Sequence, residues 1–505
     1  MRYYARKSRL ILVIHGRKPR LTIQFSKSAY KKCLIYTESA CTKCLIYTES
    51  ACTKCIMSHN TSMKRNFTEQ LIQWKNSPNR KPLLIKGVRQ VGKTYSITEF
   101  GKQNFPNVHT INFEKSEKAC RIFDGDLSPR KIIEELSFVL DTKIDPENDF
   151  IFFDEIQACP RAITSLKYFQ EEMPSLAICG AGSLLGIYLA PFSFPVGKVS
   201  FLHVFPMSFE EFLRAIDDKL LLEFFNDINL GSKISEVAHS RLWERLKHYF
   251  VVGGLPEVVE IFRHHQDNLP EAFELVRKKQ QELIDGYYAD MAKHSGKVNA
   301  MHINRIWSSI PAQLARAQDH STQRFTFKDV VPGIDRYSKL ANAIDWLENA
   351  GLIIKTYICN SAEQPLSAYT KENFFKLYVA DTGLLGALSN LSPATIMQYN
   401  FGTYKGYFAE NFVAQEFLCA GEKHLYSWQG NRSEVEFIRN INGEVIPIEV
   451  KSGNITQAKS LKVYKDRYHP AYSIIMSGQS FYIDPKTNTH RYPLYLAGKV
   501  PLEIG

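Results

Sequence analysis

The sequence predicts an α/β fold built on a parallel sheet with helices on both of its faces. Between residues 82 and 205, short apolar segments alternate with segments in which the apolar residues follow helical spacing. Nearly continuous apolar runs are typical of strands buried on both faces, and their alternation with helices favours parallel βαβ units. The apolar segments are PLLIKG (82–87), VHTINFE (108–114), DFIFFDE (149–155), SLAICGAG (175–182) and VSFLHVF (199–205).

The rest of the chain divides into a helical stretch and a mixed C-terminal part. Helical spacing dominates from residue 206 to about residue 320. Residues 337–358 then predict a helix, a stop at Gly351 and a strand, an order that is typical of a winged helix. Beyond them the sequence predicts a helix over about 405–418, followed by several short strands.

Length and charge limit the number of domains and the kind of partner. A chain of 505 residues is long enough for two to four domains with separate cores. The formal net charge is +11, but residues 1–62 hold twelve Lys or Arg against two Glu. The remaining residues carry 51 basic and 50 acidic side chains. The overall charge therefore does not indicate a nucleic-acid partner for the body of the protein.

Cysteine spacing and hydropathy favour a cytoplasmic protein without a membrane partner. The segment LILVI (10–14) is too short for the apolar part of a secretory signal. Pro174–Gly197 is uncharged, but its three prolines and four glycines fit a buried strand and loop better than a membrane span. Beyond residue 55 the cysteines are scattered singly, which is typical of reduced thiols. They are Cys120, Cys159, Cys179, Cys359 and Cys419.

The segment GVRQVGKT, Gly87 to Thr94, matches the phosphate-binding pattern G-x-x-x-x-G-K-[ST] between a predicted strand and a predicted helix. Gly87 and Gly92 allow a tight turn that points several backbone N–H groups at one phosphate chain. We expect Lys93 to reach the β and γ phosphates and the Thr94 hydroxyl to coordinate Mg²⁺. The alternative is a chance glycine-rich turn. ATP and Mg²⁺ are the expected cofactors. The loop positions between the glycines that we expect to line the nucleotide are Arg89, Gln90 and Val91.

A second motif follows 60 residues after the phosphate loop. FIFFDE ends an apolar strand with Asp154 and Glu155, as an acid that holds Mg²⁺ and a base that activates water would require. Such an ending can also be polar capping, but the upstream loop favours the catalytic interpretation. Ser183, after the next strand, is either a sensor of the γ-phosphate or a loop serine. Arg89 is expected to be a structural or phosphate-side residue, and spacing alone assigns no arginine finger.

Acidic side chains and a lysine recur on two predicted strands near the C-terminus. Glu436 lies on one strand and Glu449-x-Lys451 on the next, with NING as the hairpin turn. Because side chains alternate along a strand, Glu449 and Lys451 project from the same face. With Glu410 on the preceding helix, they resemble the PD-(D/E)XK nuclease site, in which carboxylates hold Mg²⁺ and a lysine offsets developing charge. The alternative is a solvated strand face, which the apolar context VIPIEVKS opposes.

A series of motifs links these two sites in a fixed order. They are GVRQVGKT, FIFFDEIQ, FPVGKVSFLHVFPMSFEEFL, VVGGLPEVV, FFKLYVADTGLL, GYFAENFVAQE and EVEFIRNINGEVIPIEVKSG. With them the chain from about Met63 onward resembles a large bacterial and archaeal family of AAA-class P-loop ATPases fused to a C-terminal domain of unknown function. The resemblance implies a core sheet of the 5-1-4-3-2 type, ATP with Mg²⁺, a helical and winged-helix middle, and a PD-(D/E)XK-like end. The expected domains are 63–225, 226–395 and 396–505.

Two positions depart from the family pattern. Lys198 stands in VGKV where many relatives have arginine, so a trans-acting finger is in doubt there. Glu436 stands in EVEF where relatives usually have aspartate, and the longer carboxylate would place a metal elsewhere. The departure at Glu436 therefore lowers the expectation of nucleic-acid cleavage.

Three functional hypotheses follow. The first is an ATPase whose hydrolysis drives a conformational change in an attached nucleic-acid-processing domain, with DNA or RNA as a partner. The second is an ATP-driven regulatory switch that controls partner binding or oligomerisation, with a C-terminal domain that has lost cleavage. The third is a scaffold without turnover, which the combination of Lys93, Thr94, Asp154 and Glu155 opposes. Relatives of the AAA class often form rings, so a homo-oligomer is also expected.

The N-terminal 62 residues have a different character. Cys33 to Lys43 reappears letter for letter as Cys44 to Lys54. The repeat creates two Cys-x-x-Cys pairs, but it preserves the residues between them equally well, as a tandem duplication in the coding DNA would. We expect no zinc there. Residues 1–62 are interpreted as an upstream extension read from a wrongly placed start, with a disordered basic tail and a metal or targeting function as alternatives. The pairs are Cys41 with Cys44 and Cys52 with Cys55.

Overall fold

The computed structural model divides the chain into two compact units, Met1–Ser62 and Met63–Gly505. Strands β1 (Tyr3–Arg6) and β2 (Arg9–Leu12) pair antiparallel in the first unit. The duplicated segment, its cysteines and the rest of that unit lie outside the described residues. The structure describes residues 3–6, 9–12, 63–183, 194–317, 324–398, 404–431, 433–452 and 459–503.

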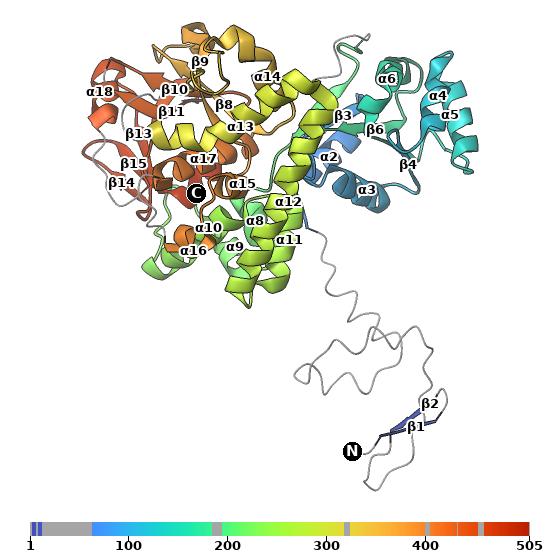
Figure 1. Ribbon diagram of the computed structural model, residues 1–505, viewed down its shortest axis with the longest axis horizontal. Helices are drawn as coiled ribbons and strands as arrows, with labels where there is room; N and C mark the ends of the chain where they lie inside the picture. The colour runs from blue at the N-terminus through green and yellow to red at the C-terminus, as the bar shows by residue number, and fades with distance from the viewer. Residues whose placement is uncertain are drawn as a thin grey trace. The chain divides into compact units, whose positions relative to one another are not determined.

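The second unit opens with a parallel sheet of the P-loop NTPase type (Figure 1). Within the described residues this sheet has five strands in the order β4-β5-β6-β3-β7, and every neighbouring pair is parallel. Counted along the chain, the order is 2-3-4-1-5, so the predicted 5-1-4-3-2 arrangement is confirmed. The strands are β3 (Leu83–Gly87), β4 (Val108–Asn112), β5 (Phe150–Asp154), β6 (Ala177–Gly182) and β7 (Ser200–Val204).

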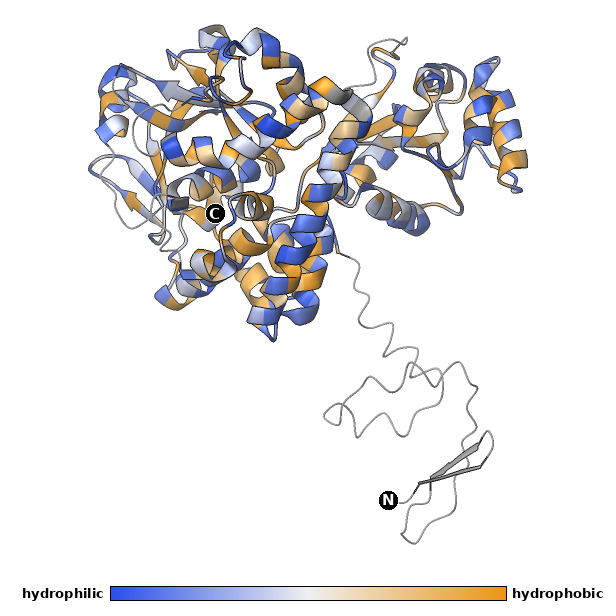
Figure 2. Ribbon diagram, viewed as in Figure 1, coloured by the Kyte–Doolittle hydropathy of each residue, from blue (hydrophilic) through white to orange (hydrophobic). Residues whose placement is uncertain are grey.

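Helices cover both faces of this sheet. Leu83 and Ile85 of β3 pack in the same apolar cluster as residues of α2 and α3, whereas Leu84 packs with α5 and α6 on the other face. This division follows from the alternation of side chains along a strand. Figure 2 shows the strands in the colours of apolar residues, with hydrophilic residues gathered on the surrounding helices. The helices are α2 (Phe67–Asn76), α3 (Lys93–Asn104), α4 (Glu117–Arg121), α5 (Pro129–Val139) and α6 (Pro160–Glu172), with short 3₁₀ turns η3 (Ile122–Asp124) and η4 (Ile156–Ala158).

Two cysteines differ from the expected reduced state. Cys120 in α4 and Cys159 at the start of α6 form a disulfide, with Cα atoms 5.6 Å apart. They are 39 residues apart in the sequence and meet because η3 packs against α6. The prediction of reduced thiols was therefore wrong for this pair, because single spacing in the sequence gives no information on contacts made by folding. Cys179, Cys359 and Cys419 are free thiols.

A helical region connects the first sheet to the second. Its longest described helix is α12 (Leu269–Ser295), which packs against α11 and α13 (Figure 1). At its end, helix α14 stops before Gly351, which has a φ of 74°, and strand β8 follows directly. This helix, stop and strand are as the sequence predicts, while the winged-helix interpretation stays a prediction. The helices are α8 (Phe209–Ala215), α9 (Lys219–Asp227), α10 (Glu236–Val252), α11 (Pro256–His265), α12, α13 (Lys297–Ala317) and α14 (Tyr337–Asn349).

The C-terminal part is built on a separate mixed sheet. Among the described residues it has eight strands in the order β14-β15-β13-β12-β11-β10-β8-β9. Asn442 and Gly443, with φ values of 53° and 89°, form the predicted turn of the β11–β12 hairpin. β8 and β9 precede residue 396, so the proposed domain boundary there does not coincide with an edge of the sheet. The strands are β8 (Ile353–Cys359), β9 (Thr370–Val379), β10 (Leu425–Gln429), β11 (Glu434–Ile441), β12 (Glu444–Val450), β13 (Ser473–Ser477), β14 (Tyr482–Asp484) and β15 (Thr489–Pro493).

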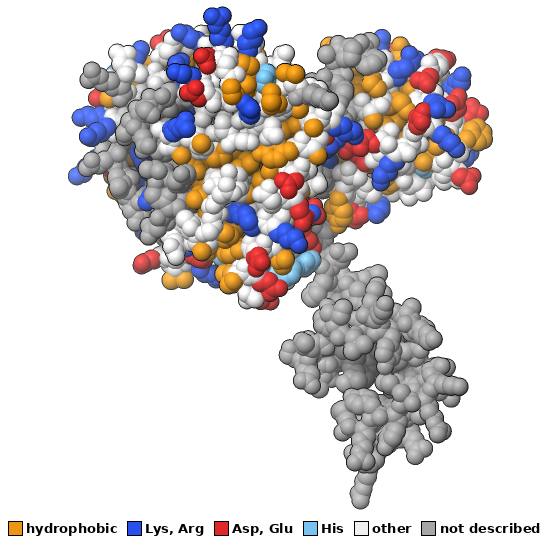
Figure 3. Space-filling view, viewed as in Figure 1, with side chains coloured by type: hydrophobic (Ala, Val, Ile, Leu, Met, Phe, Trp, Pro, Cys, Tyr) orange, Lys and Arg blue, Asp and Glu red, His pale blue; other side chains and the backbone are white. Residues whose placement is uncertain are grey.

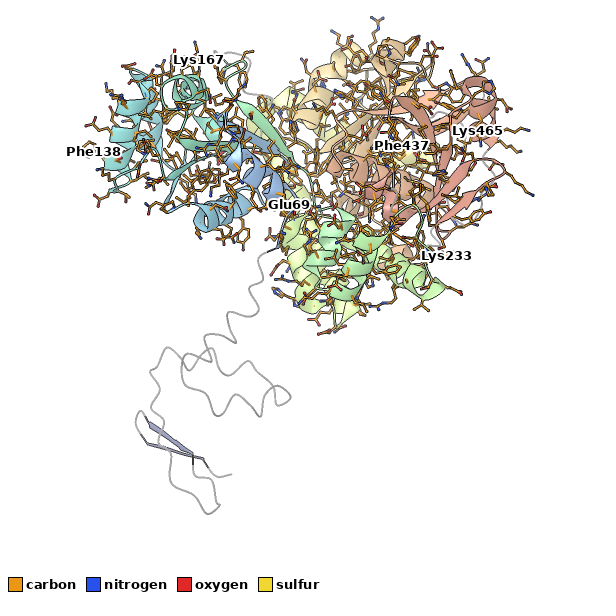
Figure 4. All side chains as sticks on the ribbon, turned by 180° about the vertical axis from the view of Figure 1, so that it is seen from behind. Glu69, Phe138, Lys167, Lys233, Phe437 and Lys465 are labelled. Carbon is orange, nitrogen blue, oxygen red and sulfur yellow. A yellow bond between two sulfur atoms is a disulfide. The ribbon has the colours of Figure 1, made fainter. Side chains whose placement is uncertain are left out.

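Helix α17 fills one face of the second sheet. Phe417 of α17 meets Phe437 of β11 edge to face, with ring centroids 5.4 Å apart. Figure 4 labels Phe437 inside the C-terminal lobe and Lys465 on its outside. The further elements of this part are η5 (Leu366–Tyr369), α15 (Thr382–Leu388), α16 (Pro393–Gln398), α17 (Tyr404–Cys419), α18 (Lys459–Tyr468) and η6 (Leu494–Lys499).

The surface agrees with the charge balance of the sequence. Figure 3 shows acidic and basic side chains intermingled on the face that contains α4 and α5. None of the helices in the described part of the chain is long and apolar enough to cross a membrane.

Candidate active site

The phosphate loop lies between β3 and α3, where the sequence predicts it. Gly92 begins α3 with a φ of 88°, and Gln90 also has a positive φ, of 63°. A Cβ atom at Gly87 would overlap the carbonyl oxygen of Val204 on the neighbouring strand, so glycine is required there. These conformations turn the backbone sharply enough to form a cradle of N–H groups at the start of a helix.

Lys93 is buried at the centre of this loop. Its ammonium donates to the carbonyl oxygens of Gly87 at 2.7 Å and Val88 at 2.9 Å. Burial lowers the pKa of Lys93 to about 8, although the negative charges of Glu155 and Asp154 oppose this shift. The lysine is therefore held inside the loop by bonds that a phosphate group can replace.

Thr94 and Asp154 lie side by side, as predicted. The Thr94 hydroxyl donates to Asp154 Oδ1 at 3.0 Å, and Asn112 Nδ2 donates to Asp154 Oδ2 at 2.8 Å. A hydroxyl beside a carboxylate is a donor set that suits Mg²⁺, so the residues present fit the expected ion. Asn112, the last residue of β4, was missed by sequence reasoning. Its position at the carboxyl end of the strand next to β5 is the signal that could have identified it.

Glu155 follows β5 in a left-handed backbone conformation, with a φ of 50°. Its Oε2 accepts a hydrogen bond from Gln157 Nε2 at 2.5 Å. Burial raises the pKa of Glu155, and the hydrogen bond from Gln157 opposes that rise. A fixed carboxylate with a raised pKa is suited to act as a general base. Gln157 lies within the FIFFDEIQ motif, yet its role required the structure.

Arg89 connects the phosphate loop to two other segments. Its Nε donates to Ser183 Oγ at 3.1 Å, which places the predicted sensor serine beside the loop. Its guanidinium pairs with Asp290 of α12, and the hydroxyl of Tyr287 in the same helix donates to the Arg89 carbonyl at 3.0 Å. Glu114 lies 3.8 Å from the guanidinium. Arg89 thus contacts both Ser183 and α12.

A buried arginine, Arg65, holds the phosphate loop through hydrogen bonds and an ion pair. Arg65 Nε pairs with Glu211 at 3.0 Å, and its two terminal nitrogens donate to the carbonyls of Val91 and Phe205, each at 2.7 Å. Sequence reasoning missed this residue because no motif marks it. Lys198, the position with a doubtful finger role, pairs with Glu171 of α6 at 3.0 Å.

The predicted C-terminal residues also come together. Lys451 Nζ lies 2.5 Å from Glu449 Oε1 and 3.8 Å from Glu436 Oε1, and the Val450 N–H donates to Glu436 Oε2 at 3.1 Å. Glu410 of α17 accepts a hydrogen bond from the hydroxyl of Tyr378 at 2.9 Å. The predicted acids and lysine therefore lie in one cluster rather than on a solvated strand face.

Two further charged residues complete this cluster, and sequence reasoning missed both. Lys376 of β9 pairs with Glu434 at the start of β11 and lies 3.6 Å from Glu410. Burial raises the pKa of Glu434 to about 7, and burial together with Glu449 raises the pKa of Glu436. The nearby glutamates raise the pKa of Lys376 against the effect of burial. In the residues that the structure describes, no group of three or more His, Cys, Asp or Glu is arranged to hold a metal ion.

Comparisons with known protein families divide the chain into three parts. Residues 79–213 match an AAA domain family. Residues 243–395 and 405–495 match two different domains of unknown function. No curated protein matches the sequence.

Several solved structures are similar to parts of the chain. They include AMPPCP-bound DnaA from Aquifex aeolicus, with 14% identity over 56% of this chain and 87% of that chain and a TM-score of 0.25. The ORC1 protein of Aeropyrum pernix in complex with DNA has 14% identity over 64% and 90%, with a TM-score of 0.25. Drosophila ORC bound to DNA has 12% identity over 71% and 100%, with a TM-score of 0.27. Scores this low do not indicate a shared overall fold, and we infer nothing from them.

The sheet order, the phosphate loop and the family match all lead to the same assignment. The loop Gly87–Thr94 and the strand that ends at Asp154 both lie inside the matched segment. Residues 79–213 are therefore an AAA-class domain, and the protein is a nucleotide-binding ATPase.

Proposed function

We propose that Mg²⁺-dependent ATP hydrolysis takes place at the loop Gly87–Thr94. The observation that carries this proposal is the meeting of Lys93, Thr94 and Asp154 at the carboxyl ends of β3 and β5. Lys93 exchanges its loop carbonyls for the β and γ phosphates, and Thr94 and Asp154 hold Mg²⁺. When bound, the ion neutralises negative charge that develops on the phosphate oxygens.

Glu155 acts as the general base of this reaction. Its carboxylate is fixed by Gln157, and its raised pKa makes it a stronger base than an exposed glutamate. It orients the attacking water and accepts its proton. Ser183, beside Arg89, is the contact for the γ-phosphate.

Nucleotide binding by the full chain tests these roles. We expect Lys93→Ala to abolish binding of a fluorescent ATP analogue in the presence of Mg²⁺, because Lys93 is the cation buried at the centre of the loop and the expected contact of the β and γ phosphates. Glu155→Gln should retain ATP and lose turnover. Lys86→Ala is the matched control, because Lys86 packs over the ring of Phe201 at 4.5 Å and should leave binding unchanged. Absence of nucleotide binding by the wild type would end the proposal.

The nucleotide state is transmitted to α12 through Arg89. A γ-phosphate at Ser183 competes with Asp290 for the guanidinium, so ATP weakens the pairing of the loop with α12. This makes the protein an ATP-driven regulatory switch, in which the helical region responds to ATP or ADP and controls a partner or an oligomer.

Hydrogen exchange in the Glu155→Gln background tests the switch. ATP should increase amide exchange in α12, and Asp290→Asn should remove that response. ATP should still bind to this variant, because the proposed contacts Lys93, Thr94 and Asp154 are unchanged. Tyr287→Phe is a milder control that removes only the bond to the Arg89 carbonyl. If ATP does not change amide exchange in α12 of the Glu155→Gln protein that retains Asp290, the proposed transmission from Arg89 to α12 is wrong.

The competing proposal is an ATPase coupled to an active nuclease-like domain that acts on DNA or RNA. The convergence of Glu436, Glu449 and Lys451 favours it. A panel of labelled DNA and RNA with Mg²⁺ or Mn²⁺, with and without ATP, separates the two. Cleavage that Lys451→Ala abolishes supports the nuclease, whereas no cleavage by either protein supports the switch.

A further inference from the structure

The C-terminal carboxylate cluster contains a cation of its own. Its four glutamates come from α17, β11 and β12, and all but the partly buried Glu436 are buried. They are Glu410, Glu434, Glu436 and Glu449. Lys376 reaches them from β9, at the edge of the sheet, and only 7% of its surface is exposed. A buried ammonium group among carboxylates is stable only when it is closely paired.

We infer that the Lys376 ammonium is the resident cation of this cluster, where it pairs with Glu434 and Glu410 and occupies a position in which a divalent metal could otherwise bind. The residues do not fit a metal ion in addition to this lysine. This inference concerns the C-terminal part alone and does not depend on the ATPase site. Of the two alternatives for the nuclease-like domain, active cleavage and lost cleavage, it favours the loss of metal-dependent cleavage.

Glu410, the acid that would support a metal ion, already has two partners on β9. Glu410 Oε2 accepts a hydrogen bond from Tyr378 at 2.9 Å and lies 3.6 Å from Lys376 Nζ. Tyr378 and Lys376 are two residues apart on β9, so they point from the same face of that strand. One edge strand thus supplies both an ammonium and a hydroxyl to this carboxylate.

The other three carboxylates of the cluster also lie near lysine side chains. Glu434 pairs with Lys376, whereas Glu449 and Glu436 lie near Lys451. Glu449 Oε2 is buried and has no hydrogen-bond partner in the described part of the chain. The four acids are therefore paired with two ammonium groups, those of Lys376 and Lys451. Lys451 is the lysine that accompanies a metal in the PD-(D/E)XK site, whereas Lys376 is an additional cation. A divalent ion bound to Glu434 and Glu410 would be repelled by the Lys376 ammonium and would have to displace it.

The inference predicts that removing Lys376 converts the cluster into a divalent cation site. Lys376→Met keeps the length of the aliphatic chain and removes the charge, which leaves Glu434 and Glu410 without their cation. The measurement uses the Asp154→Asn variant as its background, because this change removes the carboxylate that is proposed to bind Mg²⁺ at the ATP site. In that background, Mn²⁺ titration followed by electron paramagnetic resonance should show no tightly bound ion with Lys376 and about one bound ion in Lys376→Met.

Thermal unfolding gives a second readout on the same proteins. Lys376→Met should lower Tm by roughly 5–10 °C without metal, since an uncompensated buried charge is strongly destabilising. Mn²⁺ should restore much of this loss, and the added change Glu449→Gln should remove the restoration. Lys376→Arg keeps a cation in place and should stay insensitive to Mn²⁺.

Two results would overturn the inference. One is a saturable Mn²⁺ site in the Asp154→Asn protein that Glu449→Gln abolishes while Lys376 is present. The other is metal-dependent cleavage of nucleic acid by the wild type that Lys451→Ala removes. If Lys376→Met does not fold, the first measurement still decides, because it uses the natural lysine. Loss of the ATPase proposal would leave all of these results unchanged, since they are obtained without nucleotide.

Discussion

Raising the pH from 7 to 9 should weaken ATP binding by about tenfold. The pKa of Lys93 is lowered to about 8 in the nucleotide-free protein, chiefly because the ammonium is buried. Only the protonated lysine attracts phosphate, and at pH 9 roughly one molecule in eleven carries that proton, compared with ten in eleven at pH 7. Apparent affinity follows this fraction, so it falls about tenfold.

The lowered pKa of Lys93 also affects the stability of the nucleotide-free protein, which should rise with pH while ATP affinity falls. The ordinary pKa of lysine is 10.5, so between pH 8 and 10.5 the unfolded chain holds a proton at this position that the folded chain has released. Stability therefore rises with pH across that window, by about 3 kcal/mol for this group. Below pH 8 both states hold the proton, and the contribution of Lys93 no longer changes.

Titration of a fluorescent ATP analogue at pH 7, 8 and 9 with saturating Mg²⁺ measures the effect on binding. Lys93→Arg is the matched variant, because a guanidinium stays protonated throughout this range. Whatever affinity that variant retains should be nearly independent of pH. Constant affinity of the wild type from pH 7 to pH 9 would refute the assignment of the buried Lys93 ammonium as the phosphate contact.

Two further predictions concern buried charges around the ATPase domain. Arg65→Met should lower the free energy of unfolding in urea by about 3–5 kcal/mol, because Glu211 loses its buried cation. The double change with Glu211→Gln should recover part of the loss, and equal losses in both proteins would contradict the pairing. Burial raises the pKa of Glu416 to about 8 from the usual 4.5, so this group makes the wild type less stable as pH rises from 4.5 to 8. Glu416→Gln keeps an acceptor for the Phe209 N–H and should raise Tm at pH 8 but not at pH 4.5, as differential scanning fluorimetry can show.

Much of the ATPase site could be predicted because its information is local. A strand, a glycine-rich turn and a helix occupy consecutive residues, and the alternation of strands and helices fixes a parallel sheet in which β3 and β5 end at the same edge. Lys93, Thr94 and Asp154 could therefore be placed together without coordinates. The β11–β12 hairpin could also be predicted from the sequence, because Asn442-Gly443 is a turn sequence with a known backbone conformation.

The remaining contacts depend on long-range packing, for which a single sequence carries no periodic signal. Asp290 is separated from Arg89 by 201 residues. Lys376 lies on a strand whose place in the C-terminal sheet depends on its pairing with β8, and the Cys120–Cys159 pair depends on the packing of η3 on α6. None of these residues stands out by type or spacing, so none could be selected before the fold was known.

These long-range contacts converge on the phosphate loop. The Val91 carbonyl accepts a hydrogen bond from Arg65, and Arg89 pairs with α12. A Cβ atom added at Gly92 would lie 3.4 Å from Pro256 at the start of α11. A Cβ atom added at Gly351, after α14, would lie 3.3 Å from the backbone nitrogen of Val88. Segments from before the sheet and from three later helices thus contact a loop of only a few residues. Because packed interfaces change between discrete arrangements rather than deform continuously, a movement of this loop on nucleotide binding must be shared by the helices that contact it.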